Sequence, residues 1–314
     1  MQLFDMHCDT LYRAYTENST LFNDSFHISF AKADYIRPYI QCLAVWIPDE
    51  YRGERAWELF CGCVSKLREQ LAGTDILWCR TADDIRKVCE NKGQGIILTV
   101  EGGAVLGGEL SRIRMLHDEG VRMMTLTWNG RNELGDGIME KDDLGLSEFG
   151  KAAVREMERV GIIVDISHAG EKLFHDTAMT AERPFLASHS NIRAVTPHKR
   201  NLTDEQFRKL VSMGSLTGLN FCADFLAREN DAGEILQPSG MYDIIKHTGY
   251  MLSLGGGKSI AMGADFDGAD IPQDIAGIES MDRLHELFEE HFGSEITEDI
   301  FFGNAYRFFT ENIR

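Results

Sequence analysis

The chain of 314 residues can bury a large core, either as one α/β barrel or as two smaller domains. Its hydrophobic content of 43% and charged content of 26% are typical of a soluble globular protein. The formal charge of −18 argues against nucleic acid or an anionic membrane surface as a partner, because both would repel the chain.

Short apolar runs alternate with amphipathic stretches along the whole chain. Several runs are nearly continuous in apolar residues, which is typical of strands buried on both faces of a parallel sheet. We predict eight strands, over residues 3–6, 40–47, 95–100, 121–127, 162–166, 184–187, 215–220 and 259–263.

Helical patterns lie between these runs. The first has apolar positions at 3.6-residue spacing from Ala56 to Leu71, and Gly73 can end it. Cys61 and Cys63 lie within this pattern, so we interpret both as helix residues rather than metal ligands. Further helices are predicted over residues 83–91, 109–119, 147–159, 171–180, 203–213, 241–254, 281–292 and 297–312, and the fifth of these opens with the capping-box pair Thr203 and Gln206.

Eight strand-then-helix units in series favour a (β/α)₈ TIM-type barrel over an open doubly wound sheet. The glycine run that ends at Lys258 follows a predicted helix and precedes a strand, which is the reverse of a phosphate-binding loop, so we predict a helix-ending turn. There is no linker, repeat or low-complexity stretch, and we predict a single catalytic domain over residues 1–314.

The strand ends carry the candidate chemistry, because the active site of such a barrel is built from residues at the C-terminal ends of its strands. These ends hold imidazoles and carboxylates, which suit Zn²⁺ or a similar divalent ion: His7, Asp9, Glu101, His168, His189 and Asp265. Each residue alone has a simpler interpretation, as a core or loop histidine, a helix-cap neighbour or a turn former. Their placement at one face of the barrel favours a functional site.

The set predicts a two-metal site. His7 and Asp9, two apart on an extended segment, point to the same side and can hold one ion. The two later histidines can hold the other, and Glu101 can bridge both ions through its two oxygens. Two divalent ions would polarise a carbonyl and activate a shared water. Asp265 would take the proton from that water and pass it to the leaving amine.

Six motifs in series resemble those of the membrane dipeptidase (renal dipeptidase) family, a branch of the metal-dependent amidohydrolases. They are Asp5-Met6-His7-Cys8-Asp9, Glu101-Gly102-Gly103, Asp165-Ile166-Ser167-His168, Ser188-His189-Ser190, Arg200-Asn201 and Gly263-Ala264-Asp265-Phe266-Asp267-Gly268. The resemblance implies a (β/α)₈ barrel with two zinc ions, with the same five ligands and the same acid/base. It also implies that Arg200 binds the carboxylate of the substrate through its bidentate fork, although sequence alone would favour a surface arginine there.

One position departs from the family pattern. In the best-known members a histidine after the fourth strand contacts the substrate and its developing oxyanion, whereas Trp128 stands at the matching place here. Tryptophan can donate one hydrogen bond and line a pocket, but it cannot carry a proton. We therefore expect Trp128 to contact the substrate in a different way.

We expect a cytoplasmic protein. The seven cysteines are odd in number and lack CxxC spacing, which is typical of buried thiols in a reducing compartment. We recognise no signal peptide and no apolar run of about 18 residues that could span a membrane. The secreted, lipid-anchored state of the animal family members is therefore not expected.

The sequence thus predicts a binuclear zinc dipeptidase that acts on dipeptides or similar short substrates with a free carboxylate. One alternative is hydrolysis of N-acyl-D-amino acids or related small amides on the same metal site. Another is a catalytically idle metal- or peptide-binding protein, which the complete ligand set and Asp265 argue against. The expected partner is a small-molecule dipeptide, without nucleic acid or membrane, and a homodimer is compatible with the sequence.

Overall fold

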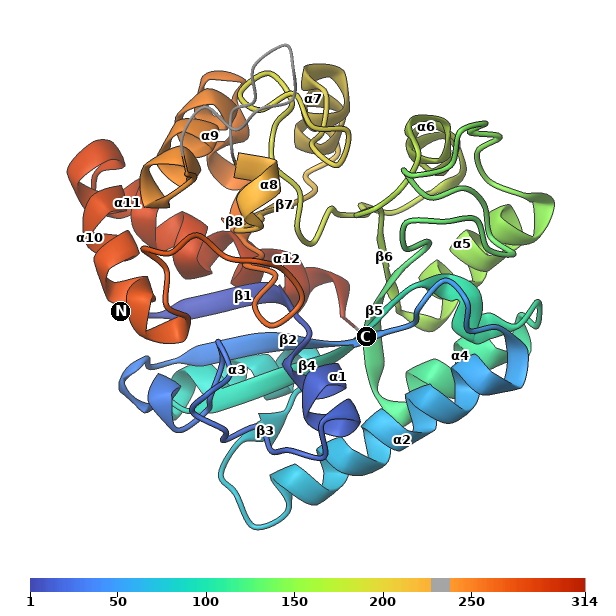
Figure 1. Cartoon of the computed structure of the whole chain (residues 1–314), viewed down its shortest axis with the longest axis horizontal. Helices are drawn as coiled ribbons and strands as arrows, with labels where there is room; N and C mark the ends of the chain where they lie inside the picture. Colours follow the sequence, from blue (N-terminus) through green and yellow to red (C-terminus); the bar gives the residue numbers. More distant parts are fainter. Residues whose placement is uncertain (227–237, 314) are drawn as a thin grey trace.

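The computed structural model describes residues 1–226 and 238–313. Its central sheet is curled, with parallel strand pairs and with helices around the outside (Figure 1). The strands follow the order β6-β5-β4-β2-β1-β8-β7, and β3 pairs with β4 off this path. Their bounds are β1 Leu3–Cys8, β2 Tyr39–Trp46, β3 Leu77–Trp78, β4 Gln94–Glu101, β5 Val121–Thr125, β6 Ile163–Asp165, β7 Thr217–Leu219 and β8 Ile260–Met262.

A short segment joins the two ends of this order. Leu186 bridges Asp165 of β6, and Ala187 bridges Thr217 of β7, both in parallel. The strand predicted over 184–187 is therefore wrong as a regular element, although the segment runs where a sixth barrel strand was expected. The pairing stops early because the next backbone N–H, that of Ser188, bonds the side chain of Asp165. With this segment included, the sheet has the TIM-like (β/α)₈ architecture that the sequence predicts.

The joins between strands differ in length. β2 and β4 pair along eight residues, from Tyr39 with Gln94 to Trp46 with Glu101. β1 and β8, in contrast, pair at Asp5 with Met262, with an isolated bridge from Cys8 to Phe266 beyond them. The first and last strands of the barrel thus meet at a short seam.

Side chains at the end of the barrel where the strands begin form a cluster separate from the main core. Phe4 and Met6 of β1 belong to it, and it also contains Phe302 and Phe309 from the C-terminal segment. The rings of Phe4 and Phe309 lie 4.9 Å apart. The C-terminal helix therefore fills the end of the barrel at which the strands begin.

The predicted helices are confirmed to within three residues, except the last. The helices are α1 Thr10–Thr16, α2 Gly53–Leu71, α3 Ala82–Glu90, α4 Ser111–Glu119, α5 Glu148–Val160, α6 Glu171–Thr180, α7 Asp204–Ser212, α8 Ala223–Leu226, α9 Met241–Ser253, α10 Met281–Phe292, α11 Ser294–Glu298 and α12 Asn304–Asn312. The helix predicted over 297–312 is divided, because a π-helical turn at Asp299–Gly303 separates α11 from α12. The helices α1 and α8, of seven and four residues, were not predicted.

Local details of the sequence interpretation are also confirmed. Thr203 and Gln206 form the capping box of α7, and Gly255 adopts a left-handed conformation (φ 91°) just after α9. All seven cysteines are free, and Cys61 and Cys63 lie on α2. Within residues 1–226 and 238–313, every helix is too short or too polar to cross a bilayer. The cytoplasmic location stays a prediction.

Candidate metal centre

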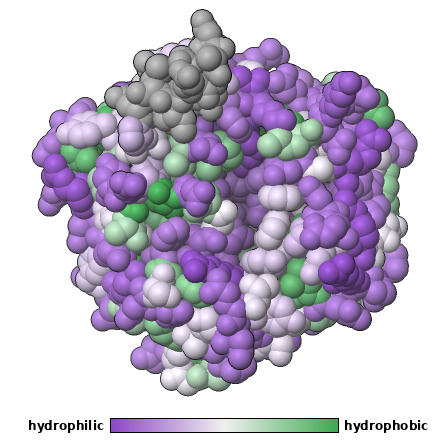
Figure 2. Space-filling view, in the orientation of Figure 1, coloured by the Kyte–Doolittle hydropathy of each residue, from purple (hydrophilic) through white to green (hydrophobic). Residues whose placement is uncertain are grey.

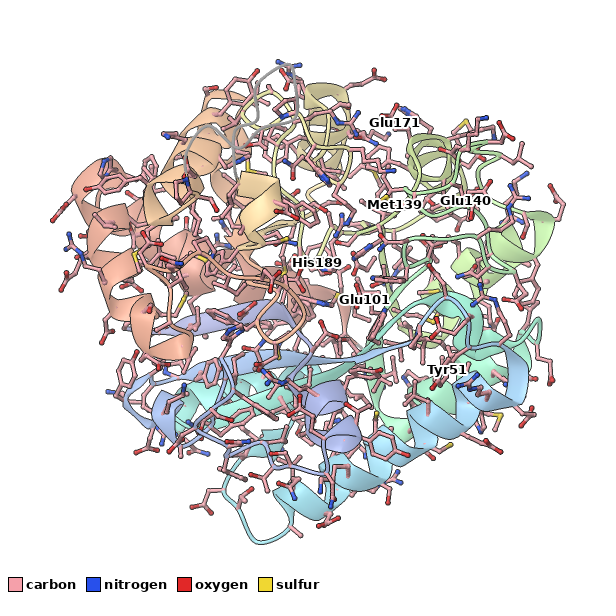
Figure 3. The ribbon with its side chains drawn as sticks, in the orientation of Figure 1. Tyr51, Glu101, Met139, Glu140, Glu171 and His189 are labelled. Carbon is pink, nitrogen blue, oxygen red and sulfur yellow. The ribbon has the colours of Figure 1, made fainter. Side chains whose placement is uncertain are left out.

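The six residues predicted from the strand ends lie together at the C-terminal end of the barrel. They form three overlapping groups in which the possible ligand atoms lie within 4.8 Å of one another: His7, Asp9 and Glu101; Glu101, His168 and His189; and His7, His189 and Asp265. In Figure 3, Glu101 and His189 lie close together near the middle of the view. Figure 2 shows the same face hollowed at its centre among mostly hydrophilic residues.

The backbone directs these side chains in different ways. Glu101 is the last residue of β4, whereas Asp9 lies beyond β1, at the N-cap of α1. The expectation that Asp9 lies on the same extended segment as His7 is therefore wrong, although the two side chains still meet. His168 and Asp265 adopt positive φ angles of 67° and 62°. Such angles are unfavourable for residues other than glycine and are often found at functional sites.

We call the group of Glu101, His168 and His189 the first half of the metal centre. Two imidazole nitrogens face each other in it. The Nδ1 of His168 lies 2.9 Å from Oδ1 of Asn129, an acceptor, so Nδ1 carries the proton. The Nδ1 of His189 lies 2.8 Å from the hydroxyl of Ser188, which already donates its proton to Asp165 and must accept here. Both Nε2 atoms therefore carry lone pairs, yet they lie only 3.0 Å apart.

A carboxylate oxygen completes this half. Oε1 of Glu101 lies 2.8 Å from Nε2 of His168 and 3.5 Å from Nε2 of His189. Burial keeps both imidazoles neutral, because it lowers the pKa of each histidine well below its ordinary value. Two nitrogen lone pairs and an oxygen thus converge on one point, which is the donor set of a divalent cation.

The second half surrounds His7. Its Nε2 lies 3.4 Å from Asp9, 3.7 Å from Oε2 of Glu101 and 3.7 Å from Asp265. Burial alone would lower the pKa of His7, but the three carboxylates outweigh it and raise this pKa to about 10. Nε2 of His7 and Oδ1 of Asp9 are buried without a hydrogen-bond partner among the described residues. This half can therefore also hold a cation in place of the proton.

Glu101 connects the two halves. Its Oε2 faces His7 and its Oε1 faces the other two histidines, so the carboxylate lies between both groups. Burial raises the pKa of Glu101 well above its usual value, although His7 opposes the shift. Burial also raises the pKa of Asp265, again against the effect of His7. The centre therefore concentrates carboxylates that a cation would stabilise in their charged form.

Arg200 is buried beside this centre, and the alternative of a surface arginine is wrong. Its side chain is 4% exposed, and its Nε has no partner among the described residues. One terminal nitrogen lies 3.5 Å from the carbonyl oxygen of His189, and the guanidinium lies 5.2 Å from the ring of Phe225. Arg200 thus keeps donor capacity that faces the cavity described next.

A cavity of about 290 Å³ opens above the centre. Asp9, Glu101, His168, Arg200 and Asp265 contribute to its lining. The rest is largely apolar, from Tyr12, Trp46, Trp128, Met139, Cys222 and Phe225. The cavity therefore combines possible metal ligands, one cation and an apolar wall.

Comparison with known proteins identifies the family. The family model for membrane dipeptidases, peptidase family M19, matches residues 1–313. The chain belongs to the membrane dipeptidase family. Family members are metallo-dipeptidases, hydrolases that act on peptide bonds, so the predicted family and enzyme class are confirmed.

Two relatives of the dipeptidase are similar in sequence over about two thirds of its chain. An uncharacterized protein in the pqqA 5′ region of Klebsiella pneumoniae is 31% identical over 212 residues, which cover 66% of this chain and 77% of that protein. An uncharacterized dipeptidase of Schizosaccharomyces pombe is 30% identical over 68% of this chain, but the match spans only 51% of that protein.

Two solved structures share the whole dipeptidase fold. Dipeptidase AC, a metallopeptidase of family M19, superposes with a TM-score of 0.91 at 26% identity, covering 100% of this chain and 99% of that one. A metallopeptidase from Rhodobacter sphaeroides, bound to a phosphinate mimic of the dipeptide L-Ala-D-Ala, has a TM-score of 0.90 at 25% identity with the same coverage. The predicted barrel architecture is therefore confirmed.

Asn220 and Trp46 are among the residues of the dipeptidase site that the sequence interpretation missed, and Tyr12 and Phe225 also line its cavity. Asn220, just after β7, donates its Nδ2 to Oδ2 of Asp265 at 3.0 Å. Trp46, the last residue of β2, lines the cavity. Both stand at strand ends, and that position was the available signal, but neither residue type is a usual metal ligand or proton carrier.

Proposed function

We propose that this family member is a binuclear zinc dipeptidase that hydrolyses the amide bond of dipeptides. The observation that carries the proposal is the position of Glu101, whose two oxygens face two separate groups of possible ligands. His7 and Asp9 would hold one cation, and His168 and His189 the other. The unprotonated, facing Nε2 atoms of the latter pair fit a cation and would repel each other without one. When bound, the cations supply Lewis acidity that polarises a carbonyl and makes water more acidic.

Asp265 is the proposed acid/base. Its Oδ2 is held by Asn220, and its carboxylate lines the cavity beside His7. Because burial raises its pKa, this carboxyl group is a better proton acceptor than an exposed aspartate. It would take the proton of the attacking water and deliver it to the leaving amine.

Arg200 is the proposed binding group for the free carboxylate of the substrate. Its buried guanidinium has an unpartnered Nε, and a bidentate interaction with a carboxylate would satisfy it. No other described residue in the lining of the cavity offers a guanidinium or ammonium group. A dipeptide would therefore be oriented by its C-terminal end.

The proposal is tested with Asp265→Asn and the matched control Asp270→Asn, an exposed carboxylate five residues further along the same loop. We expect two zinc ions per chain in the wild type and in both variants, with dipeptide hydrolysis lost only in Asp265→Asn. Full activity after chelation, or in Asp265→Asn, would refute the mechanism. A panel of L,L-dipeptides, L,D-dipeptides and N-acyl-D-amino acids distinguishes a dipeptidase from the alternative amide hydrolase.

A further inference from the structure

Three aromatic rings form a continuous wall on one side of the cavity. The ring centroids of Tyr12 and Trp46 lie 5.0 Å apart at 73°, and those of Trp46 and Trp128 lie 4.9 Å apart at 65°. These edge-to-face contacts are the preferred geometry of aromatic pairs, so each ring holds its neighbour in place. All three residues are half-buried and line the cavity. We call them the aromatic wall.

The aromatic wall lies across the barrel mouth from Arg200. Its residues follow β1, end β2 and follow β5, which are linked through β4 in the sheet order. Arg200 follows the bridging segment at 186–187, and Phe225 beside it follows β7, so both come from the opposite arc. The metal-centre residues come from both arcs, since Glu101 ends β4 and Asp265 follows β8.

This arrangement fixes the direction of a bound dipeptide, provided that the proposed function holds. We propose that the substrate places its C-terminal carboxylate at Arg200 and its N-terminal side chain against the aromatic wall. The scissile carbonyl then lies between them, above the metal centre. The wall therefore selects dipeptides whose N-terminal residue is large and apolar or aromatic.

The charges around the wall support the same selection. Arg200 is the cationic side chain among the described lining residues, and its guanidinium is taken up by the substrate carboxylate. An acidic N-terminal side chain would therefore meet the faces of aromatic rings without a cationic side chain as its partner. A small side chain such as that of alanine would leave the wall largely uncovered. A large apolar side chain would bury it.

Trp128 distinguishes the wall from the pattern of the best-known family members. The best-known family members carry a histidine there, which is smaller and can be charged. The indole adds apolar area at the end of the wall and lies 6.1 Å from the ring of His168, close to the reacting centre. Trp128 is therefore the residue whose replacement tests the proposal most directly.

The test compares kcat/KM for Phe-Ala, Ala-Phe, Glu-Ala and Ala-Ala in the zinc-loaded protein. Burial of a large apolar side chain predicts that the wild type prefers Phe-Ala to Ala-Ala by at least about tenfold. Trp128→Ala is expected to reduce this preference to about threefold or less, whereas Trp128→Phe retains most of it. Trp57→Ala, a half-buried tryptophan on α2 outside the cavity, is the control and leaves the preference unchanged.

The outcomes separate the two proposals. Hydrolysis of all four dipeptides without an N-terminal preference, a preference carried by Ala-Phe, or efficient cleavage of Glu-Ala would overturn the role of the wall alone. Equal losses for Phe-Ala and Ala-Ala in Trp128→Ala would do the same. Absence of hydrolysis for every dipeptide would overturn the proposed function and this inference together. The wild-type panel needs no variant to fold, and Trp128→His provides a second, milder replacement.

Discussion

Binding of a divalent cation at the metal centre is expected to release protons, chiefly from His7. Its Nε2 lies within 3.4 to 3.7 Å of three carboxylates, which raise its pKa to about 10 in the metal-free protein. At pH 7 the imidazole is therefore protonated, and a metal must displace that proton. A difference of three pH units corresponds to roughly a thousandfold weaker apparent affinity at pH 7 than at pH 10.

The effect of rising pH on stability has opposite signs in the metal-free and the metal-loaded protein. Because the folded-state pKa of His7 lies above the ordinary value of 6.5, its protonation stabilises the metal-free fold fully below pH 6.5. This contribution is lost as the pH rises toward 10. The metal-loaded protein gains stability over the same pH range, because only deprotonated His7 binds the metal.

The assay is titration calorimetry with zinc in buffers of different ionisation enthalpy, repeated between pH 6 and pH 9. We expect at least one proton released per chain and an apparent affinity that rises about tenfold per pH unit. His7→Gln should remove one proton from the count, whereas His117→Gln, at the end of α4, should not. A pH-independent affinity with no proton release would refute the reasoning.

Three further predictions concern contacts around the site and in the core. Asn220→Ala removes a hydrogen bond that lowers the pKa of Asp265, so the acidic limb of the kcat/KM profile is expected to move to higher pH. Ser188→Ala removes the partner of Nδ1 of His189, and dialysis against a zinc buffer should show about 10- to 100-fold weaker zinc affinity. Phe309→Ala opens a cavity in the fully buried cluster at the base of the barrel and should cost about 3–5 kcal/mol in denaturant unfolding. An unchanged pH profile, zinc affinity or unfolding free energy would contradict the respective prediction.

The sequence predicted the parts of the site that follow from barrel geometry. Glu101 and His168 could be located because parallel strands bring their C-terminal ends together, and imidazoles and carboxylates are recognisable as ligands. Asp9 was predicted to be near His7, but its position at a helix N-cap was not, because the seven-residue α1 leaves little periodic signal. Strand 184–187 was predicted as regular, since nothing in its composition reveals that the following backbone bonds Asp165.

Other parts of the site depend on tertiary packing. Trp46 ends a buried strand, and an aromatic residue in such a place cannot be distinguished from a core residue by its spacing. From the sequence alone Arg200 looked like a surface residue. Its burial depends on the ring of Phe225, which is distant in the sequence, and on the backbone carbonyl of His189. Such contacts between loops of different strands have no periodic pattern from which to predict them.

The short seam between β1 and β8 has a consequence for the dynamics of the protein. Asp5 and Met262 pair across it, and the proposed metal centre spans the same seam, with His7 on one side and Asp265 on the other. A bound cation would therefore link the first and last strands of the barrel. We expect amide hydrogen exchange in β1 and β8 to accelerate on chelation, while exchange across the eight-residue β2–β4 join changes little. The metal would then govern how often the barrel opens along this line, in addition to its part in catalysis.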